Sequence, residues 1–185
     1  ESLSALRTAV MSLEQTLLRL VADLQTQRDG LTDPEVRHLM ETIQTLEHLK
    51  EEEFFDAQRV VSNLGTIIAS NHRSTVYYAK KEAIETLIKW ATPSAKAMAD
   101  RSIENLVHSL KTKIGETSEG KKDGEGDWET RELLETLLST EIRKHYVEFL
   151  RDFIPQLEHI ISQDGYLFTR IYALDTLIKL DSEES

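Results

Sequence analysis

The segments EAIETLIKW (Glu82–Trp90) and YALDTLIKL (Tyr172–Leu180) align without a gap. They are identical at five of nine positions, and a Glu/Asp pair is equivalent at a sixth. In each copy a small residue, Ala83 or Ala173, lies among leucines and isoleucines at helical spacing. Because a small residue on a buried face lets two helix backbones approach closely, the repeat predicts two equivalent helices packed in the same way.

Helical periodicity extends through most of the chain. Apolar residues recur at three- and four-residue steps, and no segment alternates cleanly between apolar and polar residues, so we expect no sheet. We predict an all-α fold of six to seven antiparallel helices joined by short, capped turns, with prolines starting the second and fifth helices. The count is six if residues 51–54 only bend the second helix into the third. The predicted helices cover residues 3–24, 34–52, 60–68, 76–91, 94–114, 128–161 and 166–180, and Pro155 should kink or divide the sixth.

The second copy lies within a larger pattern, residues 142–180. A first helix contains Pro155, a short turn follows, and the second helix carries an arginine early in its course, Arg170. This pattern resembles a HEAT or armadillo-like helical repeat, and a weaker copy around residues 74–91 has Lys80 in place of the arginine. The resemblance implies a short α-solenoid, and the 90 residues between the copies correspond to about two repeats of roughly 40–47 residues. A closed helical bundle fits the same short turns and stays open as an alternative.

Four of the seven glycines fall between residues 115 and 126. We therefore expect residues 1–185 to form a single helical domain in which residues 115–127 are a flexible inserted loop and Asp127 caps the next helix. The chain begins with Glu1 rather than methionine, so a fragment of a longer protein is an open alternative.

Residues 121–132 within this stretch resemble a twelve-position calcium-binding loop. Asp123, Glu125 and Glu132 lie at its third, fifth and twelfth positions, and Gly126 occupies the sixth, where such loops need glycine. Lys121, however, takes the first position, where an aspartate normally anchors the ion and an ammonium group repels it. A calcium-responsive module is thus a third functional interpretation, and we expect no resident metal or cofactor.

Composition and charge narrow the function further. The net charge of −11 divides into −6 over residues 1–71, +4 over residues 72–122 and −9 over residues 123–185. Acidic ends disfavour nucleic-acid binding, which depends on neutralising phosphates. No apolar run reaches the roughly 18 residues that cross a bilayer, and the absence of cysteine excludes disulfides and thiolate chemistry. No phosphate-binding, hydrolase or metalloprotease motif occurs, so we expect no enzyme.

We predict a non-enzymatic module that binds another protein or peptide, located inside the cell in the cytoplasm or nucleus. The alternative is a helical bundle that mediates homo-oligomer assembly, in which residues 3–49 pair between chains; the oligomeric state itself is left open. The candidate partner-binding residues belong to the basic middle of the chain and are Arg73, Tyr77, Lys80, Lys81 and Arg101.

Overall fold

The structure of the protein is a computed structural model, and most of the residues that it describes are helical. Those residues form ten α-helices and no strand, which confirms the predicted all-α class for this part of the chain. The structure describes residues 2–26, 31–50, 57–70, 77–117, 127–137, 139–162 and 167–182. The chain divides into two compact units, Glu1–Ser102 and Ile103–Ser185, and the boundary falls inside α5. The expectation of one domain over residues 1–185 stays a prediction.

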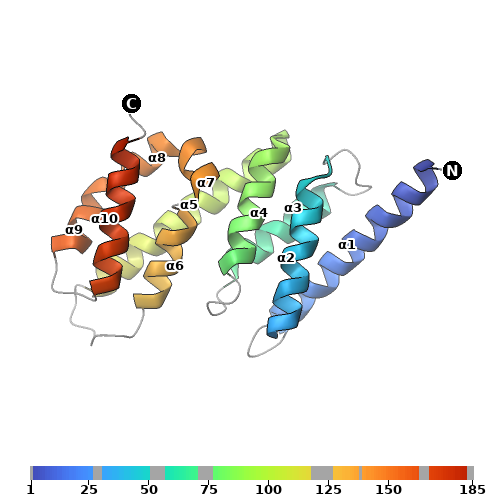
Figure 1. Ribbon diagram of the computed structural model, residues 1–185, viewed down its shortest axis with the longest axis horizontal. Helices are drawn as coiled ribbons and strands as arrows, with labels where there is room; N and C mark the ends of the chain where they lie inside the picture. Colours follow the sequence, from blue (N-terminus) through green and yellow to red (C-terminus); the bar gives the residue numbers. More distant parts are fainter. Residues whose placement is uncertain are drawn as a thin grey trace. The chain divides into compact units, whose positions relative to one another are not determined.

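Unit 1 consists of four helices and the first part of a fifth (Figure 1). The helix α1 packs against α2 and α3, and α4 packs against the same two helices. Their bounds are Ser2–Thr26 for α1, Asp33–Glu47 for α2, Ala57–Ala69 for α3, Tyr77–Trp90 for α4 and Pro93–Thr117 for α5.

The starts of α2 and α5 follow local rules that the sequence carries. The Glu35 carboxylate accepts hydrogen bonds from the backbone N–H and the hydroxyl of Thr32, at 3.2 Å and 2.8 Å, and so holds the first turn of α2. Thr92 precedes α5, where its Oγ1 accepts a 3.4 Å hydrogen bond from the backbone N–H of Ala95. Pro93 then begins the helix, because a missing N–H costs nothing there. Both proline-marked starts occur where the sequence predicts them.

The core of unit 1 is built from the apolar stripes of its helices. Gly65 of α3 lies against the side chain of Met98 in α5, and a Cβ added at Gly65 would lie 2.5 Å from the Met98 sulfur. Burial of apolar side chains in this core removes their surface from water, which stabilises the fold by about 25 cal/mol per Å². The largest fully buried side chains of the unit are Leu17, Leu20, Leu24, Leu39, Ile43, Leu46, Leu64, Ile67, Ile84 and Leu87.

Unit 2 contains the remainder of α5 and five further helices. The helix α10 packs against α6, α8 and α9, and α7 contacts α6 and α8. Their bounds are Asp127–Leu137 for α6, Thr140–His145 for α7, Val147–Arg151 for α8, Ile154–Ser162 for α9 and Leu167–Ser182 for α10. Buried apolar side chains of the unit include Ile103, Leu110, Leu134, Ile142, Leu157, Ala173 and Leu180.

The predicted sixth helix, residues 128–161, is the main departure from expectation. The structure divides it into four helices, with interruptions before Thr140, at Tyr146 and at residues 152–153. The backbone of Tyr146 has φ −113° and ψ 22°, outside the helical range. Pro155 lies in the first turn of α9, where its missing N–H costs nothing, and the interruption at residues 152–153 directly precedes that turn, as expected of a proline that divides a helix. The interruptions before Thr140 and at Tyr146 are too far upstream for Pro155 to cause them.

The predicted loop at residues 115–127 lies partly outside the described residues. Within the described part, α5 continues to Thr117 and α6 begins at Asp127. The first of these bounds extends the fifth helix three residues beyond its predicted end. The flexibility of the loop stays a prediction.

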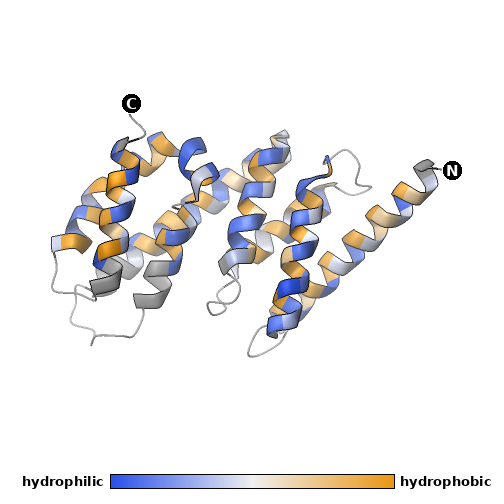
Figure 2. Ribbon diagram, viewed as in Figure 1, coloured by the Kyte–Doolittle hydropathy of each residue, from blue (hydrophilic) through white to orange (hydrophobic). Residues whose placement is uncertain are grey.

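Hydrophobic and hydrophilic residues recur in bands along the helices, as expected of amphipathic elements (Figure 2). In the described residues, no helix combines the length and apolarity that crossing a membrane requires.

Candidate protein-interaction surface

The best-defined surface of unit 1 lies where α2 and α4 run side by side. The Trp90 indole Nε1 donates a 2.7 Å hydrogen bond to the backbone carbonyl of Leu49, just beyond α2. The Lys89 Nζ lies 3.7 Å from a carboxylate oxygen of Glu47. Both contacts join the C-terminal end of α4 to the C-terminal end of α2. The two helices therefore run in the same direction, and they form what we call the α2–α4 surface.

Three carboxylates approach one another on this surface. Burial raises the pKa of Glu82, and the charges of Glu85 and Glu47 raise it further. The ammonium of Lys81 and a hydrogen bond with Gln44 act in the opposite direction. The surface is thus a partly desolvated patch of mixed charge, in which an acidic centre borders two lysines, Lys81 and Lys89.

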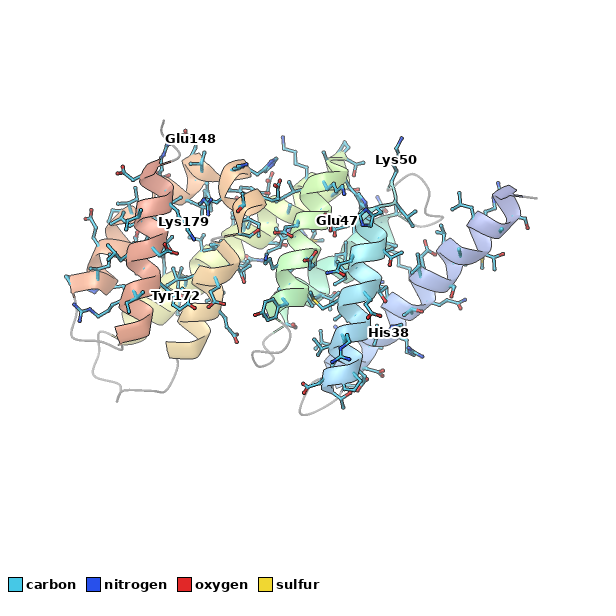
Figure 3. The ribbon with its side chains drawn as sticks, viewed as in Figure 1. His38, Glu47, Lys50, Glu148, Tyr172 and Lys179 are labelled. Carbon is cyan, nitrogen blue, oxygen red and sulfur yellow. The ribbon has the colours of Figure 1, made fainter. Side chains whose placement is uncertain are left out.

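Exposed polar side chains border the patch along α2. His38, Glu47 and Lys50 follow one another along this helix and its C-terminal end in Figure 3. Arg37, His38 and Gln44 are exposed, and Tyr78 of α4 is exposed as well. Such a surface offers hydrogen-bonding and charged groups of both signs to a partner.

The α10 helix of unit 2 repeats part of this arrangement. Tyr172, Asp175 and Lys179 occupy the positions equivalent to Glu82, Glu85 and Lys89. Asp175 and Lys179 form a 3.0 Å ion pair within the helix, and Figure 3 shows Tyr172 and Lys179 along α10. These three polar positions therefore share one side of α10, as their counterparts do on α4.

The predicted basic residues have different roles in the structure. Lys80 is half-buried, and its Nζ donates a hydrogen bond to the backbone carbonyl of Ser70. Lys81 is half-buried and belongs to the α2–α4 surface, whereas Arg101 is exposed on α5. Arg73 and the side chain of Tyr77 lie outside what the structure describes, although Tyr77 begins α4. No described contact joins Lys81 to Arg101.

The carboxylates of the α2–α4 surface were not among the predicted site residues. Glu82, Glu85 and Lys89 are spaced three and four residues apart, so the sequence shows that they share one side of α4. The approach of Glu47 and Gln44 from α2 depends on helix packing, which the spacing does not reveal.

Unit 1 also has a shallow hollow between the C-terminal ends of α1 and α3, lined by Leu24, Gln25, Thr66, Ala69 and Ser70. The hydroxyls of Thr66 and Ser70 donate to backbone carbonyls of α3 itself, at 3.1 Å and 2.8 Å. These two hydroxyl protons are therefore engaged within the helix and do not point to a bound ligand.

The side chains that the structure describes include no group of three or more histidine, aspartate or glutamate residues placed to hold a metal ion. Residues 121–126 of the calcium-like loop lie outside the described residues, so the calcium interpretation stays a prediction.

The chain matches no protein-family model, no curated protein and no solved structure.

Proposed function

We propose that this protein is a helical-repeat module of the HEAT or armadillo type that binds another protein and catalyses no reaction. The observation that best supports the repeat is a pair of matching hydrogen bonds, one in each unit. Lys80 donates to the backbone carbonyl of Ser70, and Arg170 Nε donates at 3.0 Å to that of Ile161. The two cations are equivalent in the internal repeat, and each reaches back to the C-terminal end of the preceding helix.

Two buried positions agree between the repeat copies as well. Ala83 and Ala173 are both fully buried, as close helix packing requires. Thr86 and Thr176 are buried too, and each hydroxyl donates to the backbone carbonyl four residues earlier, at 2.8 Å and 2.7 Å. The burial of these positions supports the proposed repeat, whereas the threonine bond is common to helical threonines elsewhere in the chain, such as Thr42 and Thr136.

The helix contacts within each unit support stacked hairpins. In unit 1, α1 contacts α2 and α3 contacts α4 as consecutive pairs, while α1 contacts α3 and α2 contacts α4 across the pairs. In unit 2, α9 and α10 form a consecutive pair, and α10 also contacts α6 (Figure 1). Repeat proteins stack hairpins in this way and use the surface of one helix row for recognition.

The α2–α4 surface is our candidate for the recognition surface. Its mixed charge suits a partner segment that carries both acidic and basic residues, because opposite charges across an interface raise specificity and association rate. Lys81 is the predicted site residue that contributes to it, and Lys80 supports the fold instead.

The test begins with purification of the tagged chain together with its bound proteins, followed by measurement of affinity for the recovered partner. The variant Lys81→Glu/Glu85→Lys reverses two charges of the surface without changing net charge. We expect it to weaken binding by about tenfold or more, with circular dichroism unchanged.

The matched control exchanges an exposed pair in unit 2, Lys144→Glu/Glu141→Lys, and should leave the affinity within about twofold. Equal affinity of the surface variant and the wild-type chain would contradict the assignment of the α2–α4 surface. Assembly of copies through residues 3–49 and a calcium response remain alternative predictions. Of the residues 3–49, Leu17, Leu24, Leu39 and Leu46 are buried within unit 1.

A further inference from the structure

The helix α10 exposes a row of large apolar side chains on the side away from its core. Ile171, Leu174 and Ile178 are exposed to 50%, 45% and 57%. Their spacing of three and four residues places them on one face of the helix, and we call this row the α10 stripe. Clusters of exposed large apolar side chains often mark interaction sites, because water contact with them is unfavourable.

Comparison with α4 shows that this exposure is not a general property of the repeat. Ile84, the counterpart of Leu174, is fully buried, and Ile88, the counterpart of Ile178, is half-buried. The counterpart of Ile171 is a lysine, Lys81. The α10 stripe is thus both more apolar and more exposed than the equivalent face of α4.

We propose that the α10 stripe binds the α10 stripe of a second copy, so that two α10 helices lie antiparallel in a symmetric dimer. The row is nearly self-complementary about its middle. When the twofold axis passes beside Leu174, Ile171 of one copy lies opposite Ile178 of the other, and the reverse contact forms by symmetry. Three aliphatic side chains from each copy then leave water together.

Charge along one edge of the stripe favours the antiparallel arrangement. Arg170 and Asp181 lie eleven residues apart, about three helical turns, and therefore share one side of α10. In the antiparallel pair, the Arg170 guanidinium, whose Nε donates to the Ile161 carbonyl within its own chain, lies beside Asp181 of the second copy, and this contact occurs twice. In a symmetric parallel pair this edge of one copy would lie on the opposite side of the contact from the same edge of the other copy, so Arg170 and Asp181 would not meet.

On the opposite edge, Asp175 and Lys179 are already paired within the helix at 3.0 Å. The charges on both edges are therefore compatible with a second copy. This inference does not rest on the proposed partner-binding function, because it uses residues of α10 alone.

The first test is the solution mass of the full chain over a range of concentrations, by sedimentation or light scattering. We expect the mass to rise from that of the 21.2 kDa chain toward twice that value. Leu174→Asp should raise the dissociation constant of the dimer by at least about tenfold, because it buries an unpaired charge in the contact. Asp181→Lys should weaken the dimer less than Leu174→Asp does, and its effect should be larger at low salt than at high salt.

The matched control is Leu6→Asp, the same substitution at an exposed leucine of α1, which should leave the dimer intact. All of these positions are exposed, so circular dichroism should show unchanged helicity. A monomer at every concentration, or a dimer that Leu174→Asp leaves unaffected, would overturn the inference.

The second test reads the direction of the two helices. The chain contains no cysteine, so Ile171→Cys and Ile178→Cys each introduce a single thiol. A short bismaleimide should cross-link a mixture of the two variants and leave each variant alone largely unlinked. Efficient cross-linking of each variant with itself would show a parallel pair and would also overturn the inference.

Discussion

Lys80 and Ser70 are joined by a hydrogen bond from the lysine Nζ to the backbone carbonyl oxygen of the residue that follows α3. Arg170 makes the corresponding contact in unit 2, with Ile161 in the last turn of α9, at 3.0 Å. The last carbonyls of a helix have no partner within it, and they carry the negative end of the helix dipole. In both units a cation on the second helix therefore stabilises the end of the first.

Removing either cation should destabilise its unit. We expect Lys80→Met and Arg170→Met each to lower the free energy of unfolding by about 1–3 kcal/mol, because a partly buried carbonyl loses a charged donor. Urea denaturation followed by circular dichroism measures the change. Lys96→Met, at an exposed lysine of α5, serves as the control and should cost less than about 0.5 kcal/mol. Equal effects of Lys80→Met and Lys96→Met would show that the contact with Ser70 does not stabilise the fold.

Replacing Ala91 by glycine should stabilise unit 1. Ala91 follows α4 with φ 54°, a left-handed conformation that a side chain with a Cβ disfavours, and it is exposed. The variant Ala91→Gly should raise the free energy of unfolding by about 1 kcal/mol. The same substitution inside a helix, Ala97→Gly, should lower it by about 0.5–1 kcal/mol. Thermal unfolding that shows the same sign for both variants would contradict this account of Ala91.

Gly65 and Met98 should be energetically coupled. Alanine normally stabilises a helix interior by about 1 kcal/mol relative to glycine, but a Cβ at residue 65 would lie 2.5 Å from the Met98 sulfur. We expect Gly65→Ala to be neutral or destabilising alone and stabilising in a Met98→Ala background. A double-mutant cycle by urea denaturation should give a coupling of about 0.5 kcal/mol or more. Additive effects would mean that Met98 moves aside without cost.

The raised pKa of Glu82 predicts a pH-dependent stability. A carboxyl whose pKa is higher in the folded state favours folding below its ordinary pKa of 4.5, and this contribution is lost as pH rises through the raised value. Glu82→Gln should therefore raise the melting temperature relative to the wild type at pH 7, and the gain should shrink toward pH 4. Glu104→Gln, at an exposed glutamate of α5, is the control for the general effect of removing a surface carboxylate. A gain from Glu82→Gln that is equal at both pH values would contradict the prediction.

The α-helical class and the helix starts were predictable because their causes are local. Helical spacing of apolar residues marks α1 to α5 closely, and the starts at Asp33 and Pro93 depend on capping groups within four residues. The division of residues 128–161 was not predictable from spacing. At Tyr146 the backbone departs from helical angles, yet hydrogen bonds to Ile142 and from Leu150, both 2.9 Å, keep the four-residue step. The apolar period therefore continues across the break and hides it.

The candidate site was predictable only in part. Lys81 lies on the α2–α4 surface, but Lys80, its neighbour in the sequence, holds the end of α3. Consecutive residues of a helix point about 100° apart, so one can face a partner while the next faces the chain. Glu47 could not be assigned to this surface from the sequence, because its approach to Glu82 depends on the packing of α2 against α4.

The sequence alone was sufficient for the helical class, for the capped turns and for the similarity between the segments that form α4 and α10, because these depend on spacing and on near neighbours in the chain. Tertiary packing decided which of the matching residues are buried and which are exposed. Ile88 and Ile178 are the same residue at the same repeat position, yet Ile88 is half-buried and Ile178 is 57% exposed. Spacing shows which face of a helix is apolar, whereas burial depends on whether another element of the structure covers that face.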